Sequence, residues 1–394
     1  MTTSSPVTPH PRFSLDAMRD AADVFAEQRH DRQRRRHLDV ADFDRLRDAG
    51  FLLTGVPVEY GGVFESVERS TRTICDALRI LAGGDASVAL VASMHPAVVY
   101  STRWLVMPEA PEPFAEAWRR QREEVFASAL DGHWWGTIVS EPASGGDFMR
   151  TRAVAASAPD GSGYCITGEK HFGSGSGITS FMITAAVPED EGFPDWFVLD
   201  MRDVPWDGSR GVRLLGEWDG HGMTATQSHA LAFDRFPAAR SAHRGGLRTS
   251  LEDGDGVNPG LVPCLFTAVI VGIVQKAVET ARTKLEGRRD TLGAYERAEW
   301  THVLQGAWLI EQAFEGMLRA TESAHGRDTL RGKTAIAELA ETLMTRLCRV
   351  MGGGSFARHS PFGFWFEDVR ALGFLRPPWA LAYAALDEAG WSPE

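Results

Sequence analysis

The spacing of apolar residues divides the chain into three regions of different texture. In residues 13–130, apolar residues recur every three or four positions, which is the period of an amphipathic helix. One such stripe consists of Leu15, Met18, Ala22 and Phe25. A more apolar helix is expected at 86–100. The first region is therefore predicted to be helical.

The pattern changes between residues 131 and 240. Short alternating runs, such as 163–166, 196–199 and 229–233, are separated by Gly, Pro, Asp and Ser, which is typical of strands in an antiparallel sheet or barrel. Helical periods return after the connector at 252–260. The expected fold class is α+β, with three domains: a helical domain (1–130), a central β domain (131–240) and a C-terminal helical bundle (241–394).

Composition and charge narrow the classes of function. The 394 residues are 43% apolar and carry a formal net charge of −12, so nucleic acid and anionic membrane are poor partners. One stretch is basic although the chain as a whole is acidic, and it contains Arg32, Arg34, Arg35 and Arg36. It is interpreted either as a solvated helix face or as a phosphate contact.

Other global features favour a cytoplasmic protein. The apolar run Leu261–Val274 has 14 residues, short of the roughly 20 that span a bilayer, and is interpreted as a buried helix. The N-terminus carries no secretory signal pattern. The four cysteines lie far apart without C-x-x-C spacing, so neither a disulfide framework nor a metal site is expected.

Three clusters of small and polar residues could carry chemistry: 140–147, 168–177 and 351–355. Small residues let a flat ligand approach the backbone, and the hydroxyls of Ser140 and Ser174 could bond its polar edge. The glycines at 352–354 could bring backbone amides near a pyrophosphate. Each cluster taken alone is also consistent with a simple turn.

The order of these clusters resembles the acyl-CoA dehydrogenase superfamily over nearly the whole chain. The matching segments are PVEYGG (57–62), TIVSEPASGGD (137–147), GEKHFGSGSG (168–177), WDGHGMTATQSHALAF (218–233), VMGGGSF (350–356) and FEDVRA (366–371). Members of this family place a helical N-terminal domain, a β domain and a four-helix bundle around a flavin. They are usually dimers or tetramers with flavin sites at subunit contacts.

The resemblance implies a flavin cofactor, with FAD favoured over FMN, and a homodimer or homotetramer. It also implies which positions of this chain contact the cofactor, Arg288 and the glycines reaching phosphates across a subunit contact. The full set is Val139, Ser140, His171, Phe172, Gly173, Ser174, Arg288, Gly352, Gly353 and Gly354.

The chain departs from the family's dehydrogenases at the catalytic base. Arg376 stands where the usual glutamate belongs, and the second known location corresponds to about Val262. Gly146 replaces the serine of the family's G-S-D. Together with His95, these departures resemble the monooxygenase branch, which uses reduced flavin and dioxygen on sulfur, aromatic and amino-sugar compounds.

This branch implies three catalytic positions. His95 would relay a proton, Ser174 would stabilise the reacting flavin, and Arg376 would orient an anionic or electron-rich substrate. A satisfied core histidine is an equal alternative for His95, because it lies on an apolar helix.

Three functions remain open from the sequence. The first is a flavin-dependent monooxygenase of a small molecule, supplied by a flavin reductase or another electron-transfer partner. The second is an acyl-thioester dehydrogenase with a relocated base. The third is a flavin-binding relative that has lost its chemistry.

Overall fold

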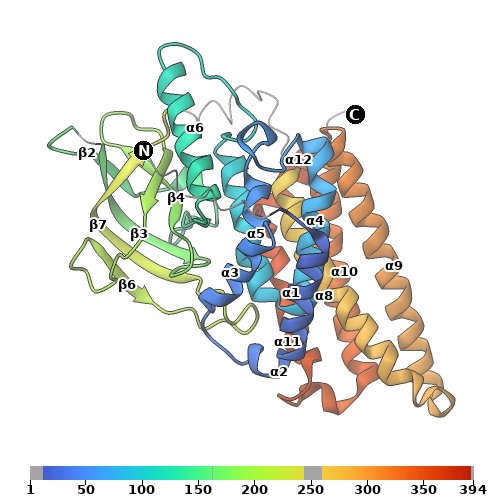
Figure 1. Ribbon diagram of the computed structural model, residues 1–394. Coiled ribbons are helices and arrows are strands. Elements are labelled where there is room, and N and C mark those ends of the chain that lie inside the picture. The colour runs from blue at the N-terminus through green and yellow to red at the C-terminus, as the bar shows by residue number, and fades with distance from the viewer. Residues whose placement is uncertain (1–11, 162, 244–259, 392–394) are drawn as a thin grey trace, which may run out of the picture.

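Helices and strands separate along the chain and in space. The computed structural model describes residues 12–161, 163–243 and 260–391. Figure 1 shows the strands gathered on one side of the molecule and the long C-terminal helices on the other, with the N-terminal helices between them. The α+β class is as predicted from the sequence.

The N-terminal helices form where the apolar periods predict them. In α1, Met18 and Phe25 face the core, and the Ser14 hydroxyl caps the helix by accepting from the Ala17 N–H at 3.3 Å. The helix α5 is buried over most of its length. The helices are α1 (Leu15–Glu27), α2 (Arg29–Arg32), α3 (Val40–Asp48), α4 (Val67–Gly84), α5 (Ala86–Ser101) and α6 (Ala115–Leu130).

The strands form one sheet in which each strand pairs with at least one other. Its order is β1-β4-β2-β3-β7-β5, β6 also pairs with β7, and β5 pairs with β4. The sheet is mixed rather than purely antiparallel as expected, because β4 runs parallel to both β1 and β2. The strands are β1 (Trp135–Thr137), β2 (Val154–Ser157), β3 (Tyr164–Gly173), β4 (Phe181–Pro188), β5 (Asp195–Asp200), β6 (Val212–Gly216) and β7 (His229–Arg240).

In residues 260–391, three long helices and two short ones follow the sheet. They are α8 (Leu261–Glu286), α9 (Ala294–Glu322), α10 (Gly326–Met351), α11 (Pro361–Val369) and α12 (Trp379–Gly390). The helix α8 is longer than its apolar run suggested, and by length and composition it could span a bilayer. However, 83% of its most apolar window is buried against the surrounding helices, as expected for a core helix.

A buried ion pair anchors the loop that follows β1. The Glu141 carboxylate accepts from Lys170 Nζ at 2.6 Å and from the Arg152 N–H at 2.8 Å. Lys170 comes from β3, has no exposed surface, and also donates to the Ala185 carbonyl of β4 at 2.6 Å. Burial alone would raise the pKa of Glu141, but these donors hold it below its ordinary value. The loop at 140–147 is thereby fixed to two strands.

A buried carboxyl group anchors a second loop, at 219–224. Asp368 of α11 accepts from the Met223 N–H at 2.6 Å. Burial, with Asp85 and Glu367 nearby, raises the pKa of Asp368 to about 7. Arg29 and Arg32 line the same small space.

Removing the cation of the first anchor is expected to destabilise the fold. Lys170→Met leaves Glu141 buried without its counter-ion, which costs about 3–5 kcal/mol in the free energy of unfolding. Urea denaturation measures this loss. The control is Arg152→Met, because Arg152 is largely exposed and lies 3.9 Å from the same carboxylate. An equal effect of the two substitutions would contradict the role given to Lys170.

The buried Asp368 carboxyl group is expected to make the stability of the fold depend on pH. The folded protein keeps the Asp368 proton up to about pH 7, whereas a carboxyl group with the ordinary value of 3.8 loses it earlier. The wild-type protein therefore loses stability as the pH rises between these values. Asp368→Asn keeps an acceptor for Met223 and cannot ionise, so its melting temperature relative to wild type should rise from pH 4.5 to pH 8. A difference that does not change with pH would refute this assignment.

Candidate active site

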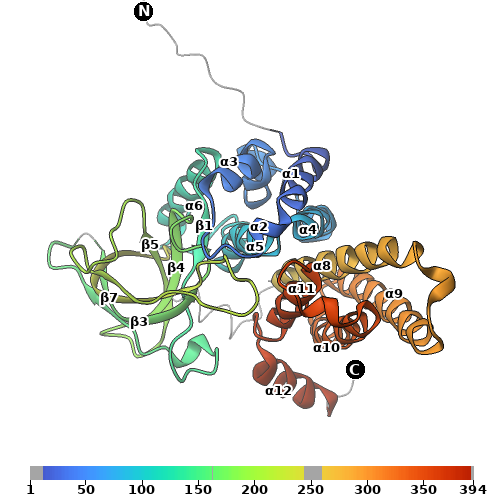
Figure 2. The ribbon, with the colours of Figure 1, turned by 90° about the horizontal axis from the view of Figure 1, so that it is seen from below.

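A cavity of about 640 Å³ lies between the sheet and the helices. Its walls come from α5, the loop after β1, the end of β3, the 218–228 loop, α8 and the segment after α11. Figure 2 shows this meeting of the sheet with α5 and α8. The lining includes six residues named from the sequence: Val139, Ser140, His171, Phe172, Ser174 and Arg376.

The wall on the sheet side has an unusual backbone. The His171 N–H donates to the Ser140 carbonyl at 2.8 Å, which joins the first two sequence clusters. Phe172 has a φ of +58°, and the pairing of β3 with β7 is irregular between Lys170 and Gly173. A left-handed Phe is strained, and its ring is 59% exposed on the cavity side rather than packed in the core. Such a surface suits stacking against a flat ligand.

A short chain of hydroxyl groups lies beside this wall. Ser174 Oγ is 2.8 Å from Ser228 Oγ, which is 2.8 Å from Thr226 Oγ1. Thr226 in turn donates to the Met223 carbonyl at 2.9 Å. Because hydroxyls both donate and accept, this chain can hold a proton or pass one on at the Ser174 end.

Arg376 closes the opposite wall. Its Nη1 donates to the Gly146 carbonyl at 2.8 Å, and its guanidinium lies over the Phe148 ring. Burial lowers the pKa of Arg376 to about 10, so it remains a cation at neutral pH. Its Nη2 is buried without a hydrogen-bond partner in the described part of the chain. A buried, unpaired donor on a cavity wall is costly unless a ligand supplies the acceptor.

Position 146, whose carbonyl accepts a hydrogen bond from Arg376, requires a glycine. Its φ is +82°, and a Cβ at this position would lie 2.8 Å from Pro378 Cγ. The family's serine would therefore not fit here without a shift, so Gly146 and the segment carrying Arg376 depend on each other.

Both carboxylates that line the cavity already have partners. Glu141 is engaged by Lys170, and Glu367 lies 2.7 Å from Arg370. Among the described residues, the lining therefore offers no unpaired carboxylate that could act as a base.

His95 lies outside this cavity lining, contrary to the proton-relay expectation. It is fully buried, its Nε2 is 2.9 Å from the Leu52 carbonyl, and its Nδ1 accepts from the Trp135 N–H at 3.3 Å. Burial lowers the pKa of His95 to about 4, so it is neutral. With both ring nitrogens bound to backbone, His95 corresponds to the core histidine that the sequence left open.

The expected phosphate contacts also lie outside the cavity lining. Arg288 follows α8 and donates to the Val350 carbonyl at 3.0 Å, next to the exposed glycines at 352–354. Arg288 and residues 352–354 therefore lie close together, as expected if they contact the same phosphates. Gly173 is buried, and a Cβ there would meet Ile138 at 2.8 Å. The contact of Arg288 with a cofactor across a subunit boundary stays a prediction.

Sequence reasoning missed several lining residues. His221, Met223, Trp218, Phe266 and Phe374 line the cavity, and none of them was named as a site residue from the sequence. The segment 218–233 was matched to the family, and that match was the available signal for the first three. Phe266 and Phe374 carry no motif, because an apolar wall residue looks like any core residue.

Comparison with known proteins agrees with this architecture. No family model matches the chain. Amino sugar nitrososynthase DnmZ from Streptomyces peucetius is 26% identical over 394 aligned positions, covering 94% of this chain and 91% of that protein.

Two solved structures share the fold over nearly the whole chain. FMN-bound TdsC from Paenibacillus sp. A11-2, a dibenzothiophene monooxygenase, has a TM-score of 0.79 at 21% identity, covering 96% of each chain. KijD3 with FMN and a dTDP-linked amino sugar has a TM-score of 0.75 at 21% identity, covering 99% of this chain and 96% of that one. The chain is therefore similar to nitrososynthases and dibenzothiophene monooxygenases, and it shares the fold that the resemblance to the acyl-CoA dehydrogenase superfamily implied.

Proposed function

We propose that this protein is an FMN-dependent monooxygenase of a small organic molecule. The observation that carries the proposal is the set of charges in the cavity: both lining carboxylates are ion-paired, and a cation, Arg376, stands at the wall. Acyl-thioester dehydrogenation needs a carboxylate base, whereas oxygenation by reduced flavin does not. The relatives named above support the same choice.

The cavity residues fit a flavin. Its volume of about 640 Å³ is in the usual range for a cofactor site, and Phe172 presents a ring face to it. Ser140 and His171 would bind the polar edge, and the unpaired Arg376 Nη2 requires an acceptor oxygen there. FMN replaces FAD as the preferred cofactor, since TdsC and KijD3 were each solved with FMN.

The protein's part in the reaction follows from the same walls. Reduced flavin, when bound, would supply the two electrons that activate dioxygen, so that one oxygen atom enters the substrate and the other leaves as water. The apolar residues Phe266, Met94 and Leu90 limit water in the cavity. Ser174, backed by Ser228 and Thr226, would hold or release a proton at its hydroxyl. A flavin reductase would supply the electrons.

Cofactor choice and reaction type are tested together. The purified protein should bind reduced FMN more tightly than reduced FAD. When it is given ¹⁸O-labelled dioxygen and an amine or thioether substrate, mass spectrometry should find one ¹⁸O atom in the product. Anaerobic bleaching of bound flavin by an acyl-CoA would contradict the proposal. It would favour a dehydrogenase with a relocated base instead.

Arg376 is expected to act through binding. Arg376→Met removes the cation and the buried unpaired donor but keeps a side chain of similar length, so the affinity for FMN or substrate should fall about 10-fold or more. Isothermal titration calorimetry with FMN and a substrate series separates the two ligands. The control is Arg119→Met, whose side chain pairs with Glu116 and Glu123 on α6 and lies outside the cavity lining. Unchanged affinities in Arg376→Met would show that the guanidinium serves the fold alone.

A further inference from the structure

A second buried lysine lies behind the wall of the candidate active site. Lys333 belongs to α10, and only 1% of its surface is exposed. Its Nζ donates to the Leu375 carbonyl at 3.0 Å and to the Pro377 carbonyl at 2.7 Å. These two residues flank Arg376 in the chain. The ammonium group therefore binds the backbone on both sides of the cation that closes the cavity.

The burial of Lys333 is not offset by an opposite charge. Lys170 is paired with a carboxylate, whereas the acceptors of Lys333 in the described part of the chain are the two carbonyls alone. Burial lowers the pKa of Lys333 to about 8, so the group remains mostly a cation at neutral pH. A buried methionine of similar length would fill the same space without this cost. What the charge contributes is the pair of hydrogen bonds to the 375–377 backbone.

The segment that Lys333 binds has little regular structure of its own. Residues 374–377 form neither helix nor strand and connect the short turn at 370–373 to the start of α12. Carbonyl groups in such a segment lack regular backbone donors, and a fixed charged donor holds them instead. Leu375, Arg376 and Pro378 all line the cavity. The position of this wall therefore depends on a side chain of α10.

Arg376 has few other contacts that could fix its position. Its Nη1 is bound to the Gly146 carbonyl, and its guanidinium lies 5.2 Å from the centre of the Phe148 ring. Its Nη2 is buried and has no hydrogen-bond partner among the described residues. A displacement of about 1 Å in the backbone that carries this group would misalign the free donor with a ligand. Lys333 opposes such a displacement on both sides.

We propose that Lys333 is a positioning residue of the candidate active site, holding the backbone around Arg376 so that the free guanidinium donor meets an acceptor oxygen of FMN. Lys333 is not part of the cavity lining, so it touches neither cofactor nor substrate and acts through Arg376. The proposal rests on the proposed function in taking FMN as the ligand.

A double-mutant cycle, measured by calorimetry with FMN, tests this role. Arg376→Met and Lys333→Met should each weaken FMN binding about 10-fold, the second because Arg376 is then present but unsupported. The double variant should bind FMN no more weakly than Arg376→Met alone, because the two residues serve one interaction. Additive losses, about 100-fold in the double variant, would overturn the proposal. Unchanged FMN affinity in Arg376→Met would also overturn it, since Lys333 would then have no ligand contact to position.

Two further variants separate positioning from general stability. Lys333→Gln keeps N–H donors for the two carbonyls and should retain more FMN affinity than Lys333→Met, so equal losses contradict the proposal. The matched control is Thr334→Val, because the buried Thr334 hydroxyl donates at 3.0 Å to two carbonyls of its own helix. This control should leave FMN affinity unchanged even if its melting temperature falls. A loss of affinity equal to that of Lys333→Met would show that destabilising α10 is sufficient.

The outcomes distinguish this proposal from the proposed function. FMN binding that depends on Lys333 and Arg376 together, without ¹⁸O in any product, supports the positioning role and overturns the monooxygenase. Incorporation of ¹⁸O with unchanged FMN affinity in Lys333→Met overturns the positioning role and leaves the monooxygenase in place. A wild-type protein that does not bind FMN overturns both.

Discussion

The Glu141–Lys170 ion pair is the constraint on which the candidate site depends. A lysine without exposed surface is unfavourable unless its charge is matched, and here the match lies in the loop that forms one cavity wall. Lys170 also reaches the Ala185 carbonyl, so the same ammonium group joins the loop to β3 and β4. Ser140, Gly146 and the Arg376 contact are positioned from that fixed point. Arg376 stands at the position of the dehydrogenase glutamate, and the two carboxylates that line the cavity, Glu141 and Glu367, are held in ion pairs.

Arginine is used in three different environments. Arg32 and Arg35 form ion pairs with Asp42 and Asp85, which fix the N-terminal segment in place. Arg376 is mostly buried with one donor bound to a carbonyl and one unbound. Arg34 and Arg358 are exposed and face a cavity. The guanidinium is weakly hydrated and stays charged when buried, which makes it the residue that suits all three environments.

Much of the fold could be predicted because apolar periodicity reports burial directly. The helices α1 and α5 and the strands β3, β5 and β7 form where the pattern places them. The parallel pairing of β4 could not be predicted, since alternation gives the faces of a strand and not its neighbours.

The candidate site, like the fold, could be predicted only in part from the sequence. Residues in glycine-rich clusters, such as Ser140 and Phe172, were found because tight backbone leaves a mark in the sequence. His95 was ambiguous because a histidine on an apolar helix has the same sequence context whether its ring meets backbone or ligand. Asp368 carries no mark either, since its raised pKa comes from burial that only the packing of α11 against the 219–224 loop creates.

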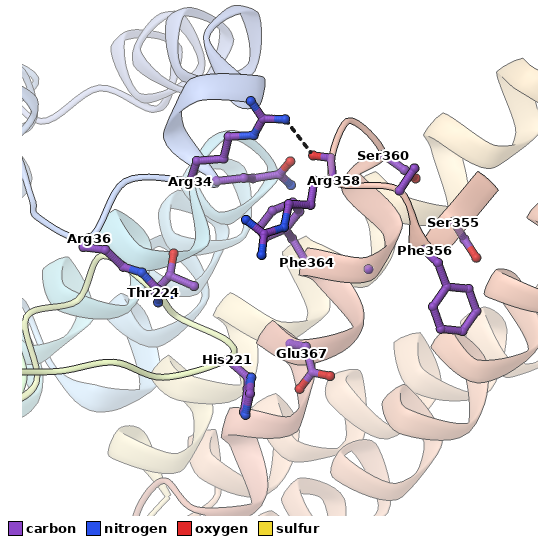
Figure 3. Close-up of a pocket in the computed structure, with 13 residues that line it drawn as sticks. Arg34, Arg36, His221, Thr224, Ser355, Phe356, Arg358, Ser360, Phe364 and Glu367 are labelled. Atoms are coloured by element: carbon purple, nitrogen blue, oxygen red, sulfur yellow. Dashed lines mark hydrogen bonds between the residues drawn. The ribbon is translucent and has the colours of Figure 1, made fainter. Parts of the chain in front are cut away.

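Two cavities of the molecule share a wall, which limits how their linings can change. His221 and Glu367 line both the candidate active site and a cavity of about 460 Å³ between the end of α2, the 221–224 loop and residues 355–367 (Figure 3). A substitution at either of these residues therefore alters both spaces, whereas a substitution elsewhere in one lining alters that space alone.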